Sequence, residues 1–184
     1  FIVNEYLNIW SLYFLDITNN FTDSIPSDSV LPHVRSDQDL YLTQGSSGIN
    51  SLFLEGRYSL SASIHARGYL GILEEMFSGA GSEILYHQYD KRWALGGSFA
   101  WVRQRDYEKN FNHKDYSTLT AFLSFYYASP LYNFDIALHA GRYLAKDVGV
   151  TLEAKRTFDN GFEVGAFITK TNVSAEEFGE GSFD

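Results

Sequence analysis

Cysteine is absent from the 184 residues of this chain, and cationic side chains are few. Without cysteine there is no disulfide framework, no thiolate zinc site and no cysteine nucleophile. The 14 lysines and arginines stand against 23 acidic residues, for a formal net charge of -9. Nucleic-acid binding needs clustered cations that neutralise phosphates, so we expect no nucleic-acid partner. Long apolar runs are missing too, since no stretch approaches the roughly 20 apolar residues of a transmembrane helix.

Aromatic residues and glycine are what the chain has in quantity. Aromatic side chains make up 17% of it, and 15 glycines stand against 3 prolines. Aromatic residues favour strands, and glycine occurs in strands where backbones approach closely, so the composition favours an all-β fold. The chain opens on Phe1 without a signal-peptide pattern, and we interpret it as a mature chain or a fragment.

Apolar residues alternate with small or polar residues through most of the chain. The run VGVTLEAK, residues 148–155, has an apolar even face and a small or polar odd face. Successive strand residues point to opposite sides of a sheet, so this pattern predicts a two-faced strand. The Asp159-Asn160-Gly161 sequence predicts a tight hairpin turn after it. We predict strands at residues 5–17, 49–60, 62–73, 82–90, 92–105, 116–128, 132–143, 147–158 and 161–172, with a long loop at 18–48.

The connections between these strands differ in length. If the strands run up and down in order, short turns lie on one rim and longer loops, including 73–81 and 105–115, lie on the other. This asymmetry is typical of transmembrane β-barrels. We therefore predict an all-β, antiparallel, up-and-down transmembrane β-barrel, with residues 1–184 as a single segment. The alternative is a soluble β-barrel or β-sandwich binding module, in which the apolar face points inward.

Two features favour the membrane barrel over the soluble fold. The polar face is rich in Gly, Ala, Ser and Thr, where a soluble surface would carry Lys and Glu. The strands also reach the roughly ten residues that span a bilayer. The predicted lumen-facing residues are Glu55, Arg57, His65, Arg67, Glu83, Asp135, His139, Glu153 and Lys155. The predicted lipid-facing residues are Leu95, Phe99, Leu123, Phe125, Phe134, Ile136, Leu138, Val150, Leu152, Val164 and Ile168.

Charged and polar residues offer few candidates for chemistry. Adjacent strand residues such as Glu74 and Glu75 point to opposite faces and cannot flank one glycosidic bond, so a role at the loop rim is the better interpretation. The five histidines show no metal-ligand spacing. Charged wall residues either contact a passing sugar chain or pair across neighbouring strands. Arg103, Arg105 and Arg142 lie near strand ends, where they bind lipopolysaccharide phosphates or form ordinary salt bridges. We predict no enzyme activity, no cofactor and no metal.

Several strings resemble one protein family. LPHVRSD (31–37), GYLGILEEMFSGAGSEILYH (68–87), RWALGGSFAWVRQRDY (92–107), LHAGRYLAKDVGVTLEAKRTFDNGFEVGAF (138–167) and VSAEEFGEGSFD (173–184) resemble the C-terminal part of the YjbH/GfcD family of bacterial outer-membrane proteins. The resemblance covers most of residues 30–184. It implies a component of exopolysaccharide and group 4 capsule secretion, in the outer membrane of a Gram-negative bacterium. Family members are several times longer, so the resemblance implies a piece of a larger barrel.

The resemblance and the strand pattern together suggest partners. About nine strands is an odd count, and open sheet edges in lipid leave unsatisfied backbone groups. We therefore expect the remaining strands to come from the same protein or from another chain. Outer-membrane lipid, lipopolysaccharide and polysaccharide are the other expected partners. The predicted role is part of a pore wall or portal for polysaccharide export; the alternative is a plugged barrel that acts as a scaffold for periplasmic secretion proteins.

Overall fold

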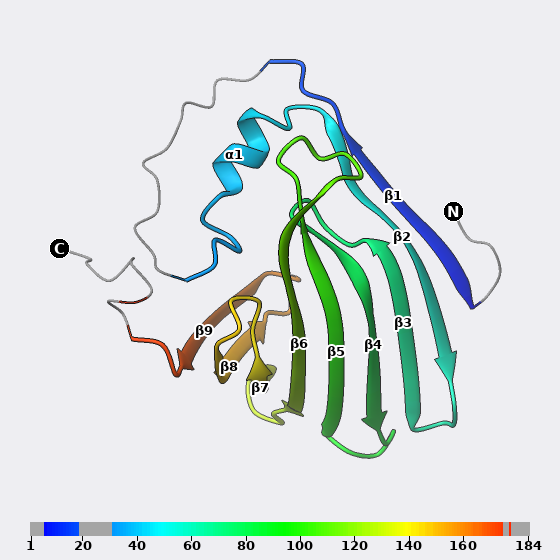
Figure 1. Ribbon diagram of the computed structural model, residues 1–184. Coiled ribbons are helices and arrows are strands. Elements are labelled where there is room, and N and C mark those ends of the chain that lie inside the picture. Colours follow the sequence, from blue (N-terminus) through cyan, green and yellow to red (C-terminus); the bar gives the residue numbers. More distant parts are fainter. Residues whose placement is uncertain (1–5, 19–30, 175–176, 178–184) are drawn as a thin grey trace.

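The computed structural model describes residues 6–18, 31–174 and 177, which form one nine-stranded antiparallel sheet and one short helix (Figure 1). Each strand pairs with the next along the chain. The elements are β1 (Leu7–Phe14), α1 (Gln38–Thr43), β2 (Gly48–Ser59), β3 (Ile64–Ile72), β4 (Phe77–His87), β5 (Trp93–Arg105), β6 (His113–Ala128), β7 (Phe134–Arg142), β8 (Val148–Thr157) and β9 (Glu163–Thr171). The all-β antiparallel fold is confirmed, whereas closure into a barrel stays a prediction.

Residues that pair in register lie on the same face of the sheet, so each face continues from one strand to the next. Leu138 of β7 pairs with Leu152 of β8, which pairs with Ile168 of β9. One residue along, His139 pairs with Thr151. Because side chains alternate, a slip of one residue would exchange the two faces. The alternation in the sequence therefore fixes which side of the sheet is apolar.

The sheet curves into a trough, and α1 lies on the concave side (Figure 1). We call residues 31–47, which contain α1, the inner segment. Tyr41 of α1 is fully buried against Phe77 of β4 and Val102 of β5. The soluble alternative expects the core on the apolar face of the sheet. In the described residues this cluster instead packs on the face that is rich in small residues.

The structure corrects the predicted start of β4. Residues 73–81 were expected to form a loop, but β4 already begins at Phe77. The Gly-Ala-Gly run at 79–81 has the composition of a loop, yet its glycines serve close packing. A Cβ on Gly81 would lie 2.6 Å from the Tyr69 hydroxyl oxygen of β3. It would also lie 2.7 Å from the backbone oxygen of Phe99 in β5, which cannot move as a side chain can, so glycine is needed inside this strand.

The connections also differ from the expected pattern. The turn at 159–161 is confirmed, with Gly161 at a φ of 83°. The predicted loop 18–48 contains α1, and its residues 19–30 lie outside the described residues. The connection before β4 is shorter than predicted. On the rim where longer loops were expected, the longer connections are therefore 15–47 and 106–112. In the described parts of the chain, no helix has both the length and the apolar character to cross a membrane.

Candidate functional site

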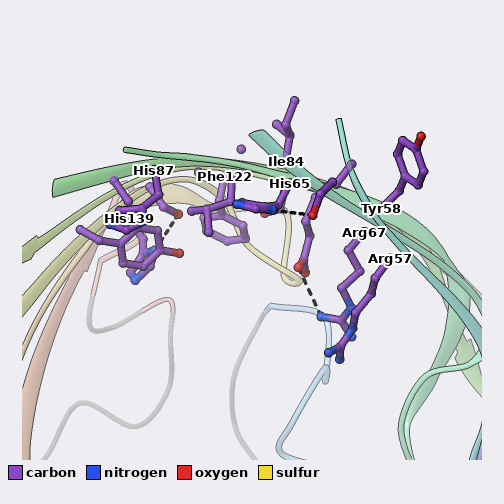
Figure 2. Close-up of a pocket in the computed structure, with 18 of the residues that line it drawn as sticks. Arg57, Tyr58, His65, Arg67, Ile84, His87, Phe122 and His139 are labelled. Atoms are coloured by element: carbon purple, nitrogen blue, oxygen red, sulfur yellow. Dashed lines mark hydrogen bonds and ion pairs between the residues drawn. The ribbon is translucent and has the colours of Figure 1, made fainter. Parts of the chain in front are cut away.

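A hollow of ≈ 1280 Å³ lies along the concave face of the sheet (Figure 2). Side chains of strands β2 to β8 line it. Figure 2 shows Arg57, Arg67 and His139 on the inner side of the arched strands, while Tyr58 and Ile84 point away on the outer side. The small and polar residues of the alternating pattern therefore form the wall of a real depression.

Four charged residues form one network on this wall. Glu55 of β2 is 1% exposed and meets Arg57 at 2.6 Å (Oε1 to Nε). Its other oxygen lies 2.7 Å from Arg67 of β3. Arg67 also reaches Glu83 of β4, at 3.3 Å. The two arginines are thus neutralised by two carboxylates, so these residues do pair across neighbouring strands.

A row of eight residues crosses the concave face, one from each of the strands β2 to β9. Each member pairs in register with the next. Ser59 and His65 form a 2.9 Å hydrogen bond, and Ser124 and His139 one of 2.8 Å. We call this row the girdle: Ser59, His65, Leu85, Gly96, Ser124, His139, Thr151 and Thr169. It presents hydroxyl and imidazole groups and carries no carboxylate, lysine or arginine.

The remaining predicted lumen residues lie at the β7 to β9 end of the concave face. Asp135 pairs in register with Lys155, whose ammonium lies 3.3 Å from Glu163. Glu153 lines the hollow and lies 3.9 Å from His139. All nine predicted residues therefore share one side of the sheet. Whether that side encloses a lumen stays a prediction.

The eleven residues predicted to face lipid lie on the opposite, convex side. Their side chains are between 38% and 69% exposed. They include Leu123 and Phe125 of β6 and Leu152 of β8, which sit on one continuous apolar surface because their strands pair in register. In the described residues this surface has no covering layer.

Arg105 is a structural residue and not a phosphate contact. It is fully buried, and its guanidinium donates hydrogen bonds of 2.7 to 3.2 Å to five backbone carbonyls. These belong to Ile49, Glu74, Glu75, Lys109 and Asn110. Neither of the two interpretations of Arg105, a lipopolysaccharide contact or a salt bridge, fits this arrangement, because both terminal guanidinium nitrogens already donate to backbone carbonyls inside the protein.

Two tyrosines attach the inner segment to the loop rim. The Tyr41 hydroxyl donates to the backbone carbonyl of Arg105, and burial raises the pKa of Tyr41 to about 12. The Tyr107 hydroxyl donates to Asp37 at 2.6 Å. Burial, followed by that hydrogen bond, raises the pKa of Tyr107 above its ordinary value. Both hydroxyls therefore stay protonated at neutral pH. No pattern in the sequence indicated this attachment.

Glu74 and Glu75 lie at the loop rim, as expected. Glu74 forms an ion pair of 2.8 Å with Arg35 of the inner segment, and Glu75 pairs with the buried ammonium of Lys109. A second hollow of ≈ 1000 Å³ separates the inner segment from β6 and β9. Over the residues that the structure describes, no group of three or more His, Cys, Asp or Glu side chains is placed to hold a metal ion.

Comparison with known proteins assigns the family. The family model described as "Exopolysaccharide biosynthesis protein YbjH" matches residues 4–184. The "Uncharacterized lipoprotein YjbH" of Escherichia coli (strain K12) is 38% identical over 179 residues, covering 92% of this chain and 25% of that protein. The chain thus spans about a quarter of the length of this relative. No solved structure matches the chain. Both matches cover nearly the whole chain, which therefore belongs to the YjbH family.

Proposed function

We propose that this chain is part of the wall of an outer-membrane β-barrel that serves the export of an exopolysaccharide or capsule. In this role it is not an enzyme and uses no cofactor. The convex face contacts lipid and lipopolysaccharide, and the concave face contacts the polysaccharide. The description of the matching family as an exopolysaccharide biosynthesis protein, and the name of the relative as a lipoprotein, support an envelope function.

The convex face is the observation that carries the proposal. Leu138, Val150, Leu152 and Ile168 are 41%, 43%, 45% and 69% exposed. A contiguous apolar surface of this kind is expensive in water and favourable in hydrocarbon. The soluble alternative requires these side chains to be packed in a dry core. Their exposure, together with charges on the concave side, supports the lipid-facing assignment.

The two sheet edges support a larger assembly. Within the described residues, β1 pairs only with β2 and β9 only with β8. In hydrocarbon each unpaired backbone group costs several kcal/mol, so both edges need further strands. The relative is about four times as long as this chain. We therefore assign the missing strands to the remainder of the same protein.

Adjacent residues of β8 give a direct test. Leu152 and Glu153 are neighbours in this strand and lie on opposite faces of the sheet. The 184 residues contain no native cysteine, and any cysteine elsewhere in the full-length protein is first replaced by serine. Single Leu152→Cys and Glu153→Cys variants of the full-length protein are labelled with a fluorophore and placed in vesicles of brominated lipid. Bromine quenches the label at residue 152 and spares the label at 153. Equal quenching, or none at 152, contradicts the proposal.

The inner segment favours a second candidate function. Tyr41 and α1 occupy the concave side, where they obstruct part of the interior. A barrel obstructed in this way acts as a scaffold for periplasmic secretion proteins and not as a conduit. Single-channel conductance of the full-length protein separates the two functions: a large, stable conductance supports a conduit, and a sealed bilayer supports the scaffold.

A further inference from the structure

We infer that the girdle is a binding site for an uncharged, hydroxyl-rich stretch of glycan, with His65 and His139 as its principal hydrogen-bonding groups. This inference deepens the proposed function and rests on it. The girdle crosses the floor of the ≈ 1280 Å³ hollow from β2 to β8, and continues from there to β9.

The two histidines have one nitrogen fixed and one available. Nδ1 of His65 is hydrogen-bonded to Ser59, and Nδ1 of His139 is hydrogen-bonded to Ser124. These bonds hold the ring orientations, as a neighbouring group does for a functional imidazole. Nε2 of His139 lies 3.9 Å from Glu153, which is beyond hydrogen-bond distance. Among the described residues neither Nε2 has a hydrogen-bond partner, so each imidazole keeps a nitrogen for a hydroxyl ligand, and that of His139 also lies within ion-pair distance of Glu153.

The charged side chains of the hollow disfavour binding of an acidic polymer. Among the described residues that line the hollow, Arg57 and Arg67 are the arginines, and no lysine lines it. Glu55 and Glu83 already neutralise them, and Glu153 adds a further negative charge. A wall that attracts a polyanion needs an excess of cationic groups. This wall has none, so it favours hydrogen bonding to neutral sugars over attraction of acidic ones.

An aromatic ring completes the site. Tyr126 contacts His139 edge to face, with ring centroids 5.6 Å apart. Its ring lies over Gly96 of the girdle, since a Cβ there would come within 3.2 Å of Tyr126 Cε2. The side chain is 38% exposed. Apolar ring faces beside a few polar groups are what sugar rings, with C–H faces and hydroxyl edges, require.

Binding at this site is expected to be weak. Two or three hydrogen bonds that replace hydrogen bonds to water leave only a small net affinity. Weak and repeated contacts suit a chain that must advance, because a polymer held tightly at one point cannot leave. The girdle is therefore better suited to transient contacts with a glycan that moves past it than to tight binding of a glycan at one position.

The test is an NMR titration of the probe, followed by its saturation transfer up to millimolar concentration, on the full-length protein in detergent. Isomaltoheptaose serves as the neutral probe and heptagalacturonate as the acidic probe of equal length. We expect isomaltoheptaose to bind more tightly than heptagalacturonate. A His65→Ala/His139→Ala variant should bind the neutral probe roughly five- to 150-fold more weakly, as loss of two hydrogen bonds implies. His113→Ala is the matched control, because His113 bonds Ser78 away from the girdle.

Three results overturn the inference: tighter binding of heptagalacturonate, unchanged binding of isomaltoheptaose by the double variant, or no binding of either probe. If the alanine variant misfolds, as judged by circular dichroism, His65→Gln/His139→Gln replaces it; its amide groups should retain part of the affinity. Binding in detergent is independent of lipid quenching and conductance. A failed titration with positive membrane results therefore rejects the girdle alone, and the reverse result rejects the membrane barrel.

Discussion

The hydroxyl of Tyr41 donates a hydrogen bond to the backbone carbonyl of Arg105, so one contact joins helix α1 to the end of strand β5. Both side chains are fully buried. Arg105 in turn holds carbonyls of β2, of the turn before β4 and of the 106–112 loop. Three separate parts of the chain therefore meet at one guanidinium, and helix α1 bonds the backbone of the same residue. This junction fixes the inner segment on the concave face.

Arg105→Ala should destabilise the loop rim strongly. Five carbonyls lose a charged donor and a buried space is left, for which we expect a loss of roughly 3 to 5 kcal/mol. Arg105→Lys keeps the charge but has fewer donors without a planar fork, so it should recover only part of the stability. Urea unfolding of the full-length protein measures both. Arg103→Ala, at an exposed residue of the same strand, is the control and should change stability by less than about 1 kcal/mol.

Docking of the inner segment should weaken at high pH. The raised pKa values of Tyr41 and Tyr107 mean that the folded state favours both hydroxyls in their protonated form. That stability is fully present below the ordinary tyrosine pKa of 10.0 and is lost as the pH rises through the folded value, which for Tyr41 is about 12. Limited proteolysis between pH 9 and about 12 should therefore show increasing cleavage of residues 31–47.

Two variants control the alkaline experiment. Tyr41→Phe and Tyr107→Phe each remove one titrating hydroxyl together with its hydrogen bond, so cleavage at pH 9 should increase and its further rise above pH 10 should be smaller. Absorbance at 295 nm follows ionisation of the tyrosines directly. If cleavage of the unmodified protein is independent of pH over this range, the hydroxyls do not control docking.

Local alternation was enough to predict the two faces of the sheet. Leu152 and Glu153 lie on opposite faces because successive side chains of a strand alternate in direction. This alternation can be recognised from neighbouring residues alone. The start of β4 could not be predicted in the same way, because the need for Gly81 comes from Tyr69 and the backbone of Phe99, which lie on other strands. Composition alone made that run resemble a loop.

The junction at Arg105 was beyond sequence reasoning for a related reason. An arginine near a strand end looks like a surface residue, since burial depends on segments far along the chain, such as Ile49. Helix α1 has only six residues and no side-chain hydrogen bond at its N-cap, so it leaves little local signal. The apolar side chain of Leu40 and the ring of Tyr41 are the features that could have suggested a docked turn.

Glu55→Gln should destabilise the β2–β3 pair. Arg57 and Arg67 are direct partners in the register, and the buried carboxylate of Glu55 separates their charges. Without it the two guanidinium groups repel each other, and we expect a loss of roughly 2 to 4 kcal/mol. Adding Arg57→Ala should restore part of this loss, which a double-mutant cycle of urea unfolding measures. No recovery in the double variant would mean that Glu55 acts mainly by packing.

Gly81→Ala and Gly68→Ala form a matched pair on neighbouring strands. A Cβ at residue 81 would lie 2.6 Å from the Tyr69 hydroxyl and 2.7 Å from the backbone oxygen of Phe99, so β4 or β5 must move. We expect a loss of about 1 to 3 kcal/mol, as for other overpacked sites. A Cβ at residue 68 meets only one atom, at 4.0 Å, and alanine there should be neutral or stabilising by up to about 1 kcal/mol. Unfolding free energies that are equal for the two variants would contradict the close crossing of Tyr69 over β4.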